Sequence, residues 1–127
     1  MIRVRFVSIP VSNQDRALAF YTEKLGFEVV TDQPFGNGQR WIELQPPGSE
    51  TLIVLFTPPG MENRIGGFQN VAFTCDDVEA AYRELSARGV EFVQPARRAE
   101  WGGVEAIFKD PDGNTFVLAA PANDADE

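Results

Sequence analysis

The sequence predicts an α+β fold built from two tandem βαβββ modules, and three observations support this. Segments 11–30 and 75–93 resemble each other at an offset of 64 residues, both pair an amphipathic helical pattern with a glycine exit, and strand-like segments surround both. The 127 residues, 43% of them hydrophobic, suit one compact domain. We predict a single domain over 1–127, with modules at 1–57 and 69–120, a linker at 58–68 and an acidic tail at 121–127.

Each repeat contains a helix that starts at a capping residue and ends at a glycine. Ser12 and Asp76 are the expected N-caps, and an acidic residue three positions later completes a capping box in both. Gly26 and Gly89 are expected to end the helices, because glycine adopts the left-handed C-terminal cap at little cost. Two unrelated helices would not be expected to share these features, so the pattern favours a repeat.

Strand-like segments surround the two helices in the same order. One precedes each helix and three follow it, which gives βαβββ twice. The segment 58–68 holds two prolines and three glycines, which is typical of a linker. The predicted strands are 3–11, 27–31, 39–44 and 51–57 in the first module, and 69–75, 90–94, 104–109 and 115–119 in the second.

The stretch KDPDGNTFVLAA, residues 109–120, predicts a strand end, a tight turn and the last strand. Pro111 presets one φ angle, and Gly113 and Asn114 tolerate positive φ. The residues that follow are β-branched or aromatic, as in strands. Val117 lies four residues past the turn glycine, so an apolar residue stands where a carboxylate would have been chemically useful.

Composition excludes several classes of function. The formal charge of −8 disfavours nucleic acids and anionic membrane surfaces as partners. The absence of histidine excludes Ser-His-Asp and Cys-His nucleophile systems and leaves oxygen ligands alone for a metal. The single cysteine, Cys75, excludes an internal disulfide. No apolar run is long enough for a transmembrane helix or a signal peptide, so we expect a cytoplasmic protein.

The repeat, together with AFYTEKLGF at 19–27 and DPDGN at 110–114, resembles the vicinal-oxygen-chelate superfamily, which includes glyoxalase I, extradiol dioxygenases, fosfomycin-modifying enzymes and bleomycin resistance proteins. The resemblance covers residues 3–120. It implies a glyoxalase-like fold in which paired modules form an eight-stranded curled sheet around a cavity. It also implies a homodimer.

The resemblance further implies where a metal would bind. Metal-using members carry ligands at positions that align with Phe6, Leu55, Asn70 and Val117, and a shift of two residues would replace Leu55 by Ile53. Only the asparagine offers an oxygen. We therefore predict no metal site at these positions and no cofactor.

Strand alternation predicts the residues that line the cavity, since residues two apart share a face. We expect Ile42 and Ile107 to face the helices, and the neighbours of each to face inward. The resulting lining is mostly apolar, which is typical of a small-molecule site. The predicted lining residues are Phe6, Ser8, Pro10, Trp41, Glu43, Asn70, Ala72, Thr74, Ala106, Phe108, Thr115 and Val117, with Leu55 beside them.

Glu43 is the candidate catalytic residue. A partly desolvated carboxylate beside Trp41 could act as a general base or anchor a cationic ligand. Alternatively, Glu43 lies at a wet sheet edge or pairs with Arg40. The aromatic side chains are also open to two interpretations, because they could stack on a planar ligand or fill the core. The aromatic candidates are Phe35, Trp41, Trp101 and Phe108.

Three functions remain open at this stage. The first is a metal-free, dimeric protein that binds a small aromatic or cationic organic molecule without catalysis. The second is a lyase, isomerase or dioxygenase-type enzyme that uses Glu43 as a base, or a metal held by oxygen ligands outside the aligned positions. The third is a fold that serves protein interaction. The sequence favours the first, because it removes the usual metal ligands and supplies no evident replacement.

Overall fold

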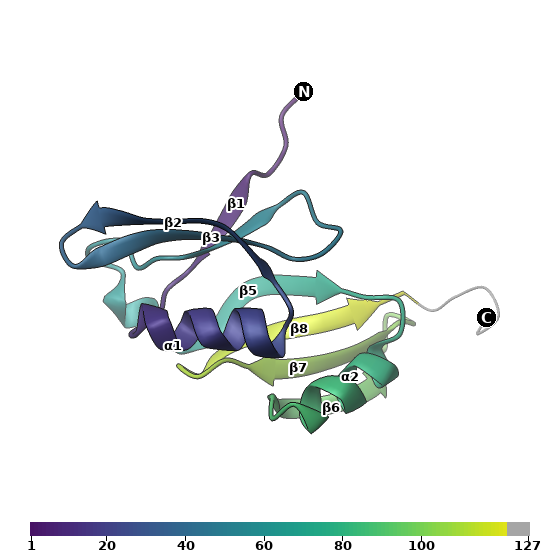
Figure 1. The fold of residues 1–127 in the computed structure, drawn as a ribbon. Helices are drawn as coiled ribbons and strands as arrows, with labels where there is room; N and C mark the ends of the chain where they lie inside the picture. The colour runs from purple at the N-terminus through teal and green to yellow at the C-terminus, as the bar shows by residue number, and fades with distance from the viewer. Residues whose placement is uncertain (122–127) are drawn as a thin grey trace. The chain divides into compact units, whose positions relative to one another are not determined.

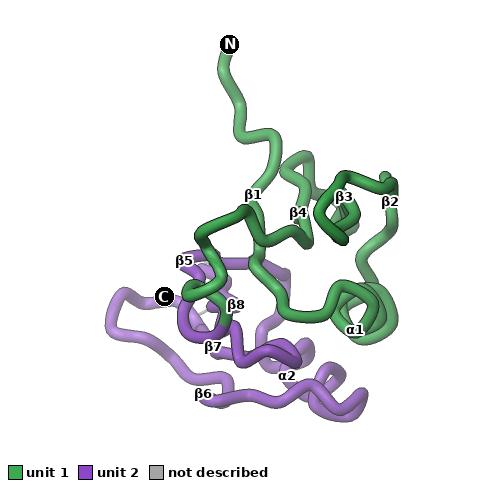
Figure 2. The backbone as a smooth tube through the Cα atoms, turned by 90° about the vertical axis from the view of Figure 1, so that its left-hand side faces the viewer, with its two compact units in different colours: residues 1–65 green, residues 66–127 purple. Residues whose placement is uncertain are grey.

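The computed structural model describes residues 1–121. The chain divides into two compact units, Met1–Ile65 and Gly66–Glu127, which Figure 2 shows in two colours. The predicted α+β fold with two βαβββ modules is confirmed, because eight strands form two sheets of four with the same strand order. Over residues 1–121, no helix combines the length and the apolar character needed to cross a bilayer.

Unit 1 contains one sheet and one short helix (Figure 1). Its strand order is β1-β4-β3-β2, with β1 parallel to β4 and the other neighbours antiparallel. Its elements are β1 (Phe6–Ile9), α1 (Gln14–Ala19), the π-helical turn η1 (Phe20–Lys24), β2 (Glu28–Gly36), β3 (Gln39–Gln45), β4 (Leu52–Leu55) and the 3₁₀ turn η2 (Glu62–Arg64).

Unit 2 repeats this arrangement. Its strand order is β5-β8-β7-β6, and β5 runs parallel to β8. β5 begins inside the predicted linker, and β6 extends four residues past its predicted end. The elements of unit 2 are β5 (Gly67–Thr74), α2 (Val78–Ala87), β6 (Glu91–Arg98), β7 (Val104–Lys109) and β8 (Asn114–Ala120).

The helices begin one residue later than predicted. Asn13 caps α1 and Asp77 caps α2, so the prediction of Ser12 and Asp76 was wrong. Both capping residues have extended backbone angles, which let the side-chain oxygen accept a hydrogen bond from the amide three residues on, at 2.9 and 3.0 Å. Neighbouring residues of equal capping ability cannot be separated by residue type alone.

The predicted helix ends are confirmed. Gly26 and Gly89 adopt φ angles of 79° and 94°, which place both in the left-handed region. In unit 1 the helix first widens into the π-helical turn η1, where the Thr22 hydroxyl donates to the Leu18 carbonyl at 2.7 Å. The repeat therefore keeps its glycine exit although the two helices differ in their last turn.

The turn before β8 is held by two buried polar side chains. Asp110 Oδ1 accepts hydrogen bonds from the amides of Asp112 and Asn114, both at 2.9 Å. Asn114 Nδ2 donates to Asp110 Oδ2 at 2.9 Å, and its Oδ1 accepts from Gly66 N at 2.7 Å and Gln69 Nε2 at 2.8 Å. The turn is therefore tied to the residues that lead into β5.

Phe108 lies on the helix side of the unit 2 sheet, contrary to the prediction. It is 2% exposed, and its ring centroid lies 5.9 Å from that of Phe92, which meets Tyr82 of α2 edge-on at 4.7 Å. Because neighbouring strand residues alternate, Ile107 faces away from α2. The predicted inward placement of Ala106 and Phe108 was therefore wrong by one residue. A ring that fills this core is not on the surface predicted to meet a ligand.

Candidate functional site

Aromatic side chains gather on the face of the unit 1 sheet that carries Trp41. The Trp41 ring lies 5.5 Å from Phe6, 5.6 Å from Phe35 and 5.2 Å from Phe56, measured between centroids. Phe35 and Phe56 also meet edge-on at 4.8 Å. Phe56 is 6% exposed whereas Phe35 is 61% exposed. We call these four residues the aromatic cluster; its inner side is packed and its Phe35 side is open.

Glu43 lies beside this cluster and is 6% exposed. Its Oε2 accepts a hydrogen bond from Trp41 Nε1 at 3.1 Å and pairs with Arg5 Nη2 at 3.2 Å. Glu43 does not lie at a sheet edge, because β3 lies between β2 and β4. Its ion-pair partner is Arg5 instead of Arg40. Among residues 1–121, no side chain donates to Glu43 Oε1. One oxygen of a mostly buried carboxylate is thus available to a ligand.

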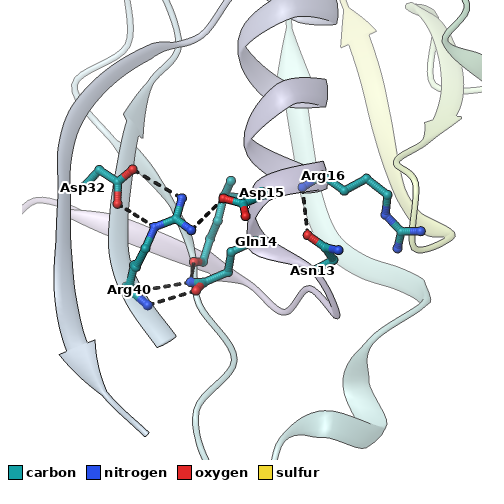
Figure 3. A network of polar contacts seen from close by, with 7 residues as sticks. Asn13, Gln14, Asp15, Arg16, Asp32 and Arg40 are labelled. Atoms are coloured by element: carbon teal, nitrogen blue, oxygen red, sulfur yellow. Dashed lines mark hydrogen bonds and ion pairs between the residues drawn. The ribbon is translucent and has the colours of Figure 1, made fainter. Parts of the chain in front are cut away.

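Arg40 joins α1 to the sheet that carries Trp41 (Figure 3). Its Nε lies 2.9 Å from Asp32 Oδ1, and its Nη1 lies 2.7 Å from Asp15 Oδ1. These hydrogen bonds, chiefly the one to Asp32, raise the pKa of the guanidinium above its already high usual value. Gln14 adds a two-way link to the Arg40 backbone, at 2.8 and 2.9 Å. The start of β3 is thereby fixed immediately before Trp41.

A hollow of about 350 Å³ lies at another part of unit 1. Thr57 Oγ1 accepts from Val11 N at 2.9 Å and donates to Val11 O at 3.0 Å. Gln39 exchanges two further hydrogen bonds with the Thr57 backbone, at 2.7 and 3.0 Å. These polar groups bond to one another, so they stabilise the local structure. The hollow is lined by Val11, Ser12, Gln14, Gly38, Gln39, Thr57, Pro59, Glu62 and Ile65.

The unit 2 face opposite α2 carries three of the predicted site residues. Val117 pairs with Ala72 of β5, and Thr74 lies two residues further along the same strand, so their side chains share this face. Trp101 lies between β6 and β7, is 57% exposed, and points its Nε1 at Glu105 Oε2 over 3.4 Å. The structure thus groups Trp101, Thr74 and Val117 by face within unit 2.

The predicted site residues of unit 1 divide between its two faces. Ser8 is the Cα partner of Val54, which in turn pairs with Glu43, so Ser8 shares the face of the aromatic cluster. Leu55 pairs with Ile9, is fully buried, and faces the other way. Its predicted place in the cavity lining was wrong, because the position was set by family alignment and not by strand alternation.

Asn70 departs from simple alternation. Its φ is 59°, and it lies within a register shift between Phe68 and Ala72 of β5. An inserted stretch of this kind redirects side chains, so alternation alone does not fix the direction of Asn70.

Sequence reasoning missed Arg5 and Phe56. Phe56 lies two residues past Val54, so alternation along β4 would have placed it on the face of Glu43. No local signal identifies Arg5, because its pairing with Glu43 depends on how β1 meets the rest of the sheet.

The positions that hold a metal in some vicinal-oxygen-chelate enzymes do not fit one here. Phe6, Leu55 and Val117 have no donor atom, and the Asn70 amide alone is too little for a divalent ion. In the part of the chain that the structure describes, no three His, Cys, Asp or Glu side chains lie close enough together to hold a metal ion.

Comparison with known proteins gives consistent matches. The family model of the Glyoxalase/Bleomycin resistance protein/Dioxygenase superfamily matches residues 3–118. YetH, an uncharacterized protein of Bacillus subtilis (strain 168), is 36% identical over 112 residues, which are 88% of this chain and 92% of YetH. A superfamily member from Sphaerobacter thermophilus DSM 20745 has a similar crystal structure, with a TM-score of 0.85, 36% identity, and coverage of 94% of this chain and 97% of its own.

A third match has a name that refers to ligand binding. TnmS3, an antibiotic binding protein from Streptomyces sp. CB03234, is 35% identical to this chain, with a TM-score of 0.83. The match covers 96% of this chain and 98% of TnmS3.

Proposed function

Because the chain belongs to the Glyoxalase/Bleomycin resistance protein/Dioxygenase superfamily, we propose that it binds a small aromatic or cationic organic molecule on the unit 1 face that carries Trp41. The observation that carries the proposal is the aromatic cluster, with the carboxylate of Glu43 beside it. Stacking surfaces with a few fixed polar groups are typical of small-molecule sites.

The two sides of the aromatic cluster have different roles in this proposal. Phe6 and Phe56 pack against Trp41, whereas Phe35 on β2 leaves much of its ring exposed. A flat ligand that covers Phe35 would remove apolar surface from water without rearranging the buried rings. Pre-formed rings also reduce the entropy lost on binding.

The carboxylate of Glu43 is the reason why the proposed ligands include cations. Arg5 and Trp41 occupy only Oε2, which leaves Oε1 for a ligand N–H. Arg5 is largely exposed, so water screens its partial neutralisation of the carboxylate. A cation over Trp41 would gain from the ring face as well as from the carboxylate.

The antibiotic-binding name of TnmS3 supports the same class of function. The enzyme alternative also has one supporting observation, since the available Oε1 of Glu43 could accept a proton from a bound substrate. The two functions make different predictions for a change at Glu43. If Glu43 is a base, the change should abolish turnover, and if it only anchors a ligand, the change should weaken binding.

The experiment is a fluorescence titration with proflavine, a planar aromatic cation, against the wild type and the variants W41F, E43Q and E50Q. We expect saturable binding, weakened about three- to thirtyfold in W41F and E43Q by loss of ring surface and charge. E50Q is the matched control, since it makes the same change at Glu50, which is exposed and lies between β3 and β4. Equal affinity in all four proteins, or no saturable binding, would overturn the proposal.

Native mass spectrometry of freshly purified protein tests the proposed subunit number and the bound metal or organic molecule. We propose a cytoplasmic homodimer without a bound metal, in keeping with the family resemblance and a lone cysteine. A dimer that carries an organic adduct would support the proposal. A monomer would contradict the proposed assembly, and a stoichiometric divalent ion would redirect attention to the enzyme alternative.

A further inference from the structure

The ion pair at Glu43 joins two unlike side chains. Arg5 Nη2 lies 3.2 Å from Glu43 Oε2, and the arginine side chain is 71% exposed whereas the glutamate side chain is 8% exposed. Residues 1–5 are exposed and lead away from the unit 1 sheet before β1 begins (Figure 1). A mostly buried carboxylate is therefore paired with a cation that lies largely in water.

The backbone at Arg5 is fixed although its side chain is exposed. Leu52 N donates to the Arg5 carbonyl oxygen at 2.9 Å, and the Thr51 hydroxyl donates to the Val4 carbonyl oxygen at 3.1 Å. These hydrogen bonds tie the residues before β1 to the start of β4. The guanidinium thus stays within reach of Glu43, and it can leave or return by side-chain rotation alone, which is fast for exposed residues.

Glu43 is the one ion-pair partner of Arg5 in the part of the chain that the structure describes. Such a pair is weak when one member is exposed, because water screens the attraction and the long side chain loses rotational freedom. The other partner of Glu43, the Trp41 indole, is neutral. A cationic ligand therefore meets a carboxylate whose charge is partly balanced by a cation that the ligand is able to displace.

We propose that Arg5 sets the charge selectivity of the unit 1 site: its guanidinium competes with a cationic ligand for the Glu43 carboxylate and moves into solvent when the ligand binds. This inference rests on the function proposed above, since it needs a ligand beside Trp41 and Glu43. It adds that the wild type binds cations less tightly than the carboxylate alone would allow. The affinity for neutral ligands does not depend on Arg5, because they do not compete for the charge of Glu43.

A purely structural role for Arg5 leads to the opposite result. If Arg5 held the Glu43 side chain in place for the ligand, its removal would weaken the binding of a cation. If Arg5 is a competitor, its removal strengthens binding, because the ligand no longer shares the carboxylate with a second positive charge. The sign of the change in affinity distinguishes the two roles.

The test titrates proflavine and acridine, which share a ring frame, by fluorescence at mildly alkaline pH, where proflavine is a cation and acridine is neutral. The variants are R5Q, R5K, R3Q, E43Q and the double variant R5Q/E43Q. R3Q is the matched control, because it removes the same charge at Arg3, an exposed residue of the same segment, whereas R5K keeps the charge in place. Thermal unfolding checks that each variant is folded, and the midpoint of R5Q should stay close to that of the wild type.

We expect R5Q to bind proflavine about three- to tenfold more tightly than the wild type, as for the loss of one screened competitor. R5K and R3Q should stay within about twofold of the wild type, and so should the acridine affinity of all three arginine variants. In the E43Q background, replacing Arg5 should change proflavine affinity by less than about twofold, because no carboxylate remains to compete for.

Unchanged or weaker proflavine binding by R5Q would overturn the inference. Equal tightening in R3Q would also overturn it, since the effect would then come from net charge in general. Both results leave the proposed function intact as long as E43Q weakens binding. Proflavine binding that does not depend on Glu43, with or without Arg5, would overturn the inference and the proposed function together.

Discussion

Replacing Asn114 by alanine tests whether the DPDGN turn is a structural anchor of unit 2. Asn114 is fully buried, and the hydrogen bonds of its side chain include contacts of 2.7, 2.8 and 2.9 Å. One goes to the carboxylate of Asp110, and the others come from Gly66 N and Gln69 Nε2. The turn, the segment before β5 and the start of β8 therefore meet at one amide.

The size of the loss follows from these contacts. A neutral hydrogen bond contributes about 0.5–1.5 kcal/mol, a hydrogen bond to a charged group about 1.5–3 kcal/mol, and groups left unpaired in the interior add to the cost. For Asn114→Ala we expect the free energy of unfolding to fall by about 3–5 kcal/mol, a large share of the ~5–15 kcal/mol typical of a domain. Asn114→Asp should cost at least as much, since it sets a second carboxylate against Asp110.

Urea unfolding followed by far-ultraviolet circular dichroism measures this loss. Asn63→Ala is the matched control, because Asn63 lies exposed in η2, and a surface change of this kind should stay within about 0.5 kcal/mol. A loss below about 1 kcal/mol for Asn114→Ala would refute the argument that the amide joins these segments.

Three further predictions concern other parts of the chain. Thr57→Val removes the hydroxyl that bonds both Val11 N and Val11 O, and should lower the free energy of unfolding by about 1–3 kcal/mol in the same urea assay; an unchanged midpoint would contradict this. Gly103→Ala places a Cβ atom where the Trp101 ring lies, so it should displace the ring, shift its fluorescence and destabilise the protein by about 1–3 kcal/mol, whereas an unaltered spectrum and thermal midpoint would count against this packing argument. Burial raises the pKa of the Cys75 thiol, so less thiolate is present at a given pH; a thiol-disulfide reagent should react with it at mildly alkaline pH more slowly than with free cysteine, and an equal rate would disprove this.

The local architecture could be predicted because its signals are local. Glycines that reach positive φ end both helices, and Gly26 and Gly89 were readable as such from residue type and position alone. Alternation along single strands was also informative, since it placed Phe6, Trp41 and Glu43 on one face, where their side chains now meet. Contacts that join distant segments, such as Arg5 with Glu43, have no local signal and were missed.

Bulges limit what alternation can predict. The register between β6 and β7 shifts between Phe92 and Gln94, so alternation counted from Phe92 does not fix the face of Gln94. Gln94 is the Cα partner of Ile107, and its buried Nε2 has no hydrogen-bond partner among residues 1–121. A bulge adds a residue without a strong signature in composition, so neither Gln94 nor its face could be identified from the sequence.

The error at Phe108 had a different origin, because the sequence did contain the information needed. The offset of 64 that relates Ile9 of β1 to Phe73 of β5 also equates Leu44 with Phe108, and all four residues lie on the helix side of their sheets. Matching Ile42 to Ile107 by residue type used an offset of 65 instead. This shift of one residue assigned Ala106 and Phe108 to the wrong face of the sheet.

The correct offset has a consequence for function. It equates Trp41 with Glu105, so the two contacts between a tryptophan and a glutamate use non-equivalent positions of the repeat. Trp41 reaches its glutamate from within β3, whereas Trp101 reaches across from a loop. Because the two tryptophan–glutamate contacts use non-equivalent positions, the repeat does not predict that the two faces bind the same ligands. The two carboxylates also differ: Arg5 and Trp41 both contact Oε2 of Glu43, whereas Arg97 and Trp101 contact different oxygens of Glu105.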